Sequence, residues 1–266
     1  MEINQDGYDS KTSGIMPMSI KLNMKFDLHT HSYKSFDSLS SIENIIKYAK
    51  KRGLNGIAIT DHEVLTSDDV MDIARRNDIW IIKGIEARTE IGDIIGLFIS
   101  KELKSRKALD LLNEIHDQGG VATLPHPFKY MKYMNYYPEN VLEKIDAVEI
   151  VNARWQDMNL FANNPKVKQL LSIVRGRSAG SDSHFPFELG RAYWTTPYIT
   201  SQEELKKSIC ANTGQAVSIS FSDWLDELSQ CIKFFKDPSL KQFARIVYWP
   251  SRRIIFGKRN ILNEQE

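Results

Sequence analysis

The segment FDLHTHS places His29 and His31 two residues apart, directly after a short apolar run that begins at Phe26. Because residues two apart on a strand point to the same face, both imidazoles can aim at one point. Asp182 and His184 have the same spacing in the segment GSDSH. Imidazoles and carboxylates on one face form a mixed nitrogen and oxygen site, which suits Zn, Mn or Fe. The two segments therefore predict metal binding.

Most other residues of this kind also stand where a predicted strand ends. The complete set is His29, His31, Asp61, His62, Glu86, His126, Asp182 and His184. Of the six histidines, only His116 lies within a predicted helix, and we interpret it as structural. One ion cannot use so many ligands, so we expect two or three divalent ions, with Glu86 bridging a pair at roughly 3.5–4 Å.

Apolar runs alternate with amphipathic stretches from residue 25 to about residue 220. The predicted strands are 26–32, 55–60, 78–85, 93–100, 121–124, 146–151 and 177–181, and the predicted helices lie near 40–53, 67–74, 105–118, 138–144 and 164–174. Strands that alternate with helices imply parallel pairing through right-handed crossovers. About seven such units, without a glycine-rich phosphate loop, favour an α/β closed barrel whose carboxyl rim carries the site.

Composition narrows the class of protein. A net charge of +1 gives no global field for nucleic acid, so any attraction for anions must be local. Cys210 and Cys231 lie outside any paired motif, and we expect both to be reduced. No apolar run approaches the roughly 18 residues that span a bilayer. We expect a cytoplasmic protein.

The chain divides into three predicted parts. Residues 1–23 are expected to form a flexible leader, 24–220 the barrel and 221–266 a C-terminal helical appendage. Basic and aromatic residues interleave in the appendage: Lys241, Arg245, Arg252, Arg253, Lys258 and Arg259 with Phe243, Tyr248, Trp249 and Phe256. That pattern could rest on an anionic membrane surface or contact a partner. We favour the simpler interpretation, a helix packed on the barrel with its charges in solvent.

The motifs DLHTHS, TDH, GIE, PHP and GSDSH, in this order, resemble the five signatures of the PHP (polymerase and histidinol phosphatase) family of metal-dependent phosphoesterases. The resemblance runs from about residue 24 to about residue 215. The five motifs in this order are specific to the family, although each motif alone is not. The resemblance implies a distorted (β/α)7 TIM-like barrel that holds up to three metal ions at its C-terminal rim.

The resemblance also implies a ligand set for each ion. The first ion would be held by His29, His31, Glu86 and Asp182, the second by Glu86 and His126, and the third by Asp37, His62 and His184. In many relatives the strand after the glutamate begins with a histidine that completes the second site. This chain has Asp93 there, which can still ligate but prefers harder ions such as Mn or Mg.

Catalysis would then need cationic groups near the ions. Our hypothesis is that a metal-held hydroxide attacks phosphorus at the di- or trinuclear centre, in line with the leaving alcohol. Arg154 is the first candidate to clamp the phosphate, Arg191 the second and Lys129 the third, with an ordinary ion pair as the alternative for each. Asp61 could orient His62 or relay a proton to the leaving group.

The sequence therefore predicts a phosphoesterase that acts on a small phosphorylated metabolite or a nucleotide. The absence of a basic stripe in the barrel argues against long nucleic acid. One alternative is a nuclease-like phosphodiesterase of the same fold. Another is a non-catalytic, metal-binding regulatory module.

Overall fold

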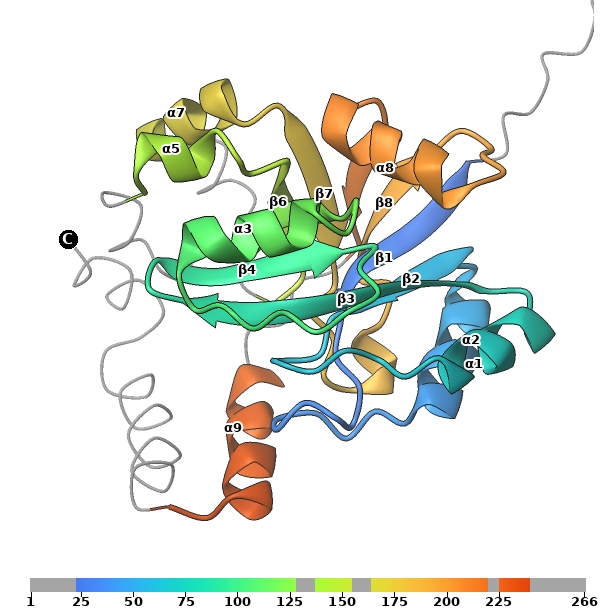
Figure 1. Ribbon diagram of the computed structural model, residues 1–266. Coiled ribbons are helices and arrows are strands. Elements are labelled where there is room, and N and C mark those ends of the chain that lie inside the picture. The colour runs from blue at the N-terminus through green and yellow to red at the C-terminus, as the bar shows by residue number, and fades with distance from the viewer. Residues whose placement is uncertain (1–22, 128–136, 155–163, 220–224, 240–266) are drawn as a thin grey trace, which may run out of the picture.

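A curved sheet of nine strands dominates the computed structural model, which describes residues 23–127, 137–154, 164–219 and 225–239 (Figure 1). The strands are β1 (Met24–Thr30), β2 (Gly56–Ile59), β3 (Trp80–Thr89), β4 (Gly92–Leu97), β5 (Val121–Leu124), β6 (Ala147–Asn152), β7 (Gly176–Gly180), β8 (Ala192–Thr196) and β9 (Gln215–Ser218). Their order in the sheet is β7-β6-β5-β4-β3-β2-β1-β8-β9. The predicted α/β barrel is confirmed.

The sheet closes where β1 meets the chain that follows β7. Asp182 N donates to His29 O at 2.8 Å, and His31 N donates to Ser183 O at 2.9 Å. Gly180 permits this approach, because a Cβ at that position would lie 2.3 Å from the Cβ of His29. These backbone hydrogen bonds therefore join the segment that carries His29 and His31 to the segment that carries Asp182 and His184.

Two features of the sheet differ from the prediction. The strand β4 was expected to pair in parallel like the other strands, but it runs antiparallel to both β3 and β5. Only Glu90 and Ile91 separate β3 from β4, and a parallel connection needs a dozen or more residues. Strands β8 and β9 were not predicted; β8 extends the sheet antiparallel to β1, and β9 pairs antiparallel with β8.

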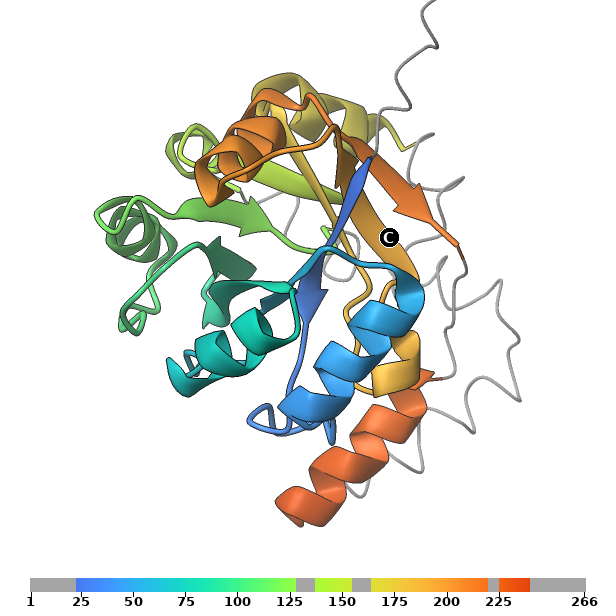
Figure 2. The same ribbon diagram turned by 90° about the vertical axis from the view of Figure 1, so that its right-hand side faces the viewer.

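The helices before residue 212 cover the outside of the curved sheet, whereas the last described helix lies at one end of the barrel (Figure 2). The described helices are α1 (Ile42–Arg52), α2 (Asp69–Arg76), α3 (Ala108–His116), α5 (Glu139–Leu142), α7 (Pro165–Ile173), α8 (Gln202–Ala211) and α9 (Leu225–Lys236), with a 3-10 turn at Pro186–Glu188. Helix α1 ends at Gly53 as predicted, with φ of 67°. Its N-cap is Ser41, whose side chain accepts from Asn44 N.

Isoleucine is abundant in the core on both faces of the sheet, since Ile81 and Ile82 are neighbours on β3 but belong to different apolar clusters. Ile57, Ile81, Ile82, Ile85 and Ile94 are all at most 2% exposed, which agrees with the preference of buried strands for branched side chains. Apolar contacts on both faces of the sheet thus hold the barrel together, and the candidate ligands gather at the carboxyl rim.

Of the predicted C-terminal appendage, the structure describes residues 225–239, which contain α9. The interleaved basic and aromatic residues from 241 onward lie outside the described residues, as does the leader up to residue 22. No helix within the described ranges is long and apolar enough to cross a membrane.

Candidate metal centre

Four side chains from three distant parts of the chain converge on one point. Strand β1 supplies His29 and His31, β3 supplies Glu86, and the turn after β7 supplies Asp182. The two Nε2 atoms lie 3.1 Å apart. His31 Nε2 is 3.4 Å from Glu86 Oε2 and 3.3 Å from Asp182 Oδ1, and His29 Nε2 is 3.6 Å from each of these oxygens.

These spacings fit a shared metal ion. Donor atoms bound tetrahedrally to one ion at about 2.0–2.2 Å lie about 3.3–3.6 Å from one another. All four residues are at most 2% exposed, and buried groups of this kind need a charge partner. The donor set is the one expected for the first ion.

Glu86 connects this set to a second one. Its other oxygen, Oε1, lies 3.0 Å from His126 Nε2, so the two oxygens of one carboxylate face different histidines. His126 has φ of 27° and Asp182 has φ of 54°, a region of backbone space that costs energy for residues other than glycine. Strained backbone at two candidate ligands is typical of a functional site.

The third predicted set also comes together. Asp37 lies in the loop after β1, with Oδ1 at 3.2 Å from His184 Nε2 and Oδ2 at 3.5 Å from His62 Nε2. His62 Nδ1 is in turn 3.0 Å from Glu86 Oε2, so this set adjoins the first. His31, His62 and His184 also offer nitrogens within 4.8 Å of one another.

Neighbouring acceptors determine which nitrogen of each histidine faces the ions. Ser35 Oγ donates to Asp61 Oδ1 at 2.7 Å, so at 3.1 Å it must accept from His31 Nδ1. His184 Nδ1 donates to the carbonyl oxygen of Asp182 at 2.9 Å. Both histidines therefore keep the Nε2 lone pair for a ligand, an arrangement common around bound metals.

Asp61 thus acts on a different histidine from the one predicted. Its Oδ1 accepts from Ser32 N at 2.7 Å and from Ser35 Oγ, and its Oδ2 accepts from Ser32 Oγ at 2.6 Å. The Oγ of Ser35 in turn accepts from His31 Nδ1. The same Oγ accepts from the backbone N of His62, and not from its imidazole. The orienting role fits Asp61, but the imidazole it orients is that of His31.

Glu149 was missed by the sequence analysis. Its Oε1 lies 3.0 Å from His29 Nδ1, and its Oε2 accepts from His126 N at 2.8 Å and Asn152 Nδ2 at 2.9 Å. Because a carboxylate only accepts, His29 Nδ1 must donate, which points Nε2 at the candidate ion. A signal was present: Glu149 is a buried acid inside the apolar strand DAVEIV.

The electrostatics of the cluster favour a cation among its carboxylates. Burial and the nearby imidazoles of His184 and His62 lower the pKa of His31 to about 3. Burial also lowers the pKa of His62, but the Glu86 and Asp37 carboxylates outweigh it and raise that pKa to about 10. Although burial works against ionisation, His62 helps to hold the pKa of Glu86 well below its ordinary value. A neutral His31 beside ionised Glu86 is the protonation state that metal ligands require.

Asp93, Arg154 and Arg191 each contact a residue outside this cluster. Asp93 pairs with Arg88, with 2.5 Å between Oδ1 and Nη1. Arg154 is buried, and its Nε donates to Glu188 Oε1 at 2.9 Å, which is the ordinary ion pair that the sequence left open. Arg191 has its guanidinium 6.0 Å from the ring centroid of Phe187. Lys129 lies outside the described residues.

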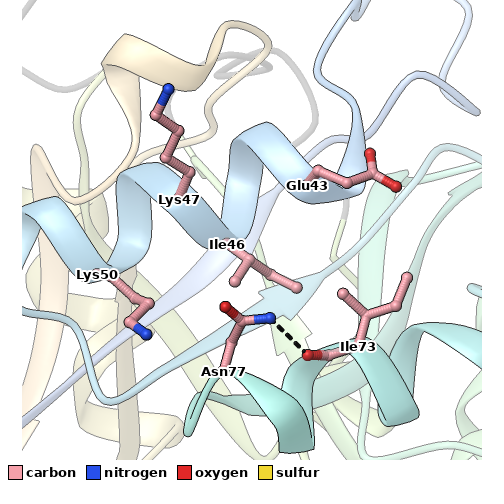
Figure 3. Close-up of a pocket in the computed structure, with 6 residues that line it drawn as sticks. All are labelled: Glu43, Ile46, Lys47, Lys50, Ile73 and Asn77. Atoms are coloured by element: carbon pink, nitrogen blue, oxygen red, sulfur yellow. Dashed lines mark hydrogen bonds between the residues drawn. The ribbon is translucent and has the colours of Figure 1, made fainter.

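His116 lies away from the cluster, as predicted, with Nε2 at 2.9 Å from Asp146 Oδ2. A hollow of about 320 Å³ lies between α1 and α2, lined by Glu43, Ile46, Lys47, Lys50, Ile73 and Asn77 (Figure 3). None of these residues belongs to the histidine and carboxylate cluster. The hollow has no ligand set of its own, so we base the functional argument on the cluster.

Residues 27–174, more than half of the chain, match the sequence profile of the PHP domain. The chain belongs to the PHP domain family. Among curated relatives, this PHP protein is similar to the uncharacterized protein MJ1587 of Methanocaldococcus jannaschii, with 32% identity over 162 residues. That match covers 55% of this chain and 94% of the relative.

Solved structures share the fold of this PHP protein. A two-domain Bacteroides vulgatus protein, described as containing a predicted PHP-like metal-dependent phosphoesterase, superposes with a TM-score of 0.61 at 20% identity, over 74% of this chain and 65% of that one. The lesion-specific endonuclease PfuEndoQ of Pyrococcus furiosus gives a TM-score of 0.53 at 17% identity, over 74% and 58%. Identities this low relate the folds alone.

Proposed function

We propose that this PHP protein is a metal-dependent phosphoesterase that hydrolyses the phosphate ester of a small metabolite or a nucleotide. The observation that supports it best is the convergence of His29 Nε2, His31 Nε2, Glu86 Oε2 and Asp182 Oδ1, separated by 3.1–3.6 Å in the five distances given above. Among neighbours of this fold, the Bacteroides vulgatus protein is described as containing a predicted PHP-like metal-dependent phosphoesterase.

Three groups of residues would hold divalent ions. The first comprises His29, His31, Glu86 and Asp182, the second Glu86 with His126, and the third Asp37, His62 and His184. Clustered divalent ions lower the pKa of bound water and polarise phosphoryl oxygens. Mn or Zn suits this mixture of imidazole and carboxylate.

The other residues of the site position these ligands. Glu149 holds the His29 ring, and Asp61 holds the His31 ring through Ser35. Arg154 holds Glu188, which also accepts from His184 N at 2.8 Å. Arg154 therefore supports His184 in this proposal, and a role as phosphate clamp for Arg154 or Arg191 stays a prediction. Asp93 as a ligand of the second ion also stays a prediction.

A metal-replete activity screen tests the proposal. The purified chain would be loaded with Mn²⁺ or Zn²⁺ and offered nucleotide, sugar and amino-alcohol phosphates together with a generic aryl phosphate. We expect phosphate release that a chelator abolishes and that metal restores. Bound metal without release of phosphate from any ester would instead favour a non-catalytic metal-binding module.

A further inference from the structure

Helix α9 reaches the candidate metal centre from the far end of the chain. It lies beside the loop that follows β1 (Figure 1). Lys236, the last residue of α9, donates from Nζ to three backbone carbonyl oxygens of that loop: Tyr33 O at 2.9 Å, Ser35 O at 2.7 Å and Ser38 O at 2.6 Å. About 200 residues of sequence separate the donor from these acceptors.

The chemistry of this contact is specific to an ammonium group. Lysine has three N–H donors and no acceptor, and each of the three donors has one carbonyl here. Three carbonyl dipoles that converge on one point repel one another unless a cation lies between them, and charge-assisted hydrogen bonds are the stronger kind. Lys236 therefore stabilises the particular shape of the loop from residue 33 to residue 38.

The carbonyls that Lys236 binds lie on either side of a candidate ligand, Asp37. Ser35 is also held on the barrel side, because its Oγ donates to Asp61. Ser38 is held likewise, because its Oγ lies 2.8 Å from the carbonyl oxygen of His184. The backbone before and after Asp37 is thus fixed between α9 and the barrel, which leaves the carboxylate facing His184.

A second residue of α9 contacts the same region. Lys233, one turn before Lys236, has Nζ 3.9 Å from the ring centroid of Phe36. The Phe36 ring stacks on the imidazole of His62, with 4.6 Å between centroids and 8° between planes. Phe36 therefore lies against both α9 and His62, another candidate ligand of the third ion.

From this geometry we infer that α9 is a part of the metal centre, and that Lys236 is a positioning residue that sets Asp37 for the third ion. The inference rests on the proposed metal centre and goes beyond it, because it assigns a functional task to the C-terminal helix. Lys233 supports the same site through Phe36 and His62. The first ion would be held by β1, β3 and the turn after β7, and α9 reaches it only indirectly, because the Ser35 that Lys236 binds also accepts from His31 Nδ1.

The test compares the full-length chain with its Lys236→Met variant, which keeps the length of the side chain but removes all three donors. Mn²⁺ alone is titrated by equilibrium dialysis, without any phosphate ester. We expect one equivalent to bind at least about tenfold more weakly, the range seen for groups that orient metal ligands, while the tightest equivalent is weakened much less. Backbone amides of residues 33–41 should exchange faster with deuterium, and those of α8 should not.

Lys207→Met is the matched control, because Lys207 is an exposed lysine of α8. The Lys207→Met variant should leave both the Mn²⁺ affinities and the deuterium exchange of residues 33–41 unchanged. Full Mn²⁺ affinity in Lys236→Met would overturn the inference, even if residues 33–41 exchange faster, because α9 would then only brace a surface loop. Equal weakening of every equivalent with faster exchange throughout the chain would overturn it too, since that indicates general destabilisation. Failure of the wild type to release phosphate refutes only the proposed activity, because dialysis measures ion binding directly.

Discussion

Replacing Glu149 with glutamine changes one atom of the candidate metal centre and should weaken it strongly. Glu149 accepts on both oxygens: Oε1 from His29 Nδ1, and Oε2 from His126 N and Asn152 Nδ2. A glutamine has only one acceptor oxygen. If this oxygen keeps the two bonds on the Oε2 side, the new NH₂ group faces His29 Nδ1.

The imidazole of His29 must then accept at Nδ1 and carry its proton on Nε2, the atom that points at the candidate ion. In the other orientation, the NH₂ group faces two N–H donors and leaves them without a partner, at a cost of about 1–3 kcal/mol each. In either orientation of the glutamine amide, the metal centre should bind its ions more weakly. Loss of an orienting partner weakens metal binding about 10–100-fold, which corresponds to about 1.4–2.8 kcal/mol.

The assay is competition with a chelator for Zn²⁺ in the wild type and in Glu149→Gln, with histidine nitrogen NMR to read the tautomer of His29. Asp146→Asn is the matched control, because Asp146 also accepts from a histidine and a backbone amide, at 2.9 Å from His116 Nε2 and 2.7 Å from Ala122 N. Wild-type affinity in Glu149→Gln would refute the reasoning.

Three further predictions follow from the same structure. Gly180→Ala should lower the free energy of unfolding by about 3 kcal/mol or more in urea titrations, because its Cβ would lie 2.3 Å from that of His29; an unchanged midpoint would contradict it. Burial raises the pKa of Asp27 to about 6 despite its backbone hydrogen bonds, so its stabilisation is present below pH 3.8 and lost as the pH rises through 6. Measured without metal, the wild type should therefore lose about 2 kcal/mol relative to Asp27→Asn between pH 4 and pH 7, and a pH-independent difference would count against this. Asp182→Asn should stay folded, because asparagine tolerates its φ of 54°, yet lose phosphate release; wild-type turnover would exclude Asp182 as a ligand.

The sequence was most informative about features that depend on local residue patterns. Strand periodicity placed His29 and His31 on one face, and Glu86, His126 and Asp182 were expected at strand ends beside them. Strand ends meet at one rim when parallel strands close a barrel, so the cluster could be foreseen without knowing any contact.

Other features depend on tertiary contacts and left little local trace. The direction of β4 depends on a turn too short for a crossover, which was overlooked. Strand β9 is partly exposed, so it lacks a strong apolar pattern. Ser35 reads as an ordinary loop serine, and only the fold shows that it links Asp61 to His31. Lys236 acts on a loop about 200 residues earlier in the chain, and no sequence pattern predicts that pairing.

The central claim is that these side chains hold metal ions, and anomalous diffraction from crystals grown with Mn²⁺ tests it most directly. We predict one anomalous peak at about 2.0–2.3 Å from His29 Nε2, His31 Nε2 and Asp182 Oδ1, with a second peak beside Glu86 and His126. Peaks elsewhere on the chain, with no density among these residues at saturating Mn²⁺, would contradict the account.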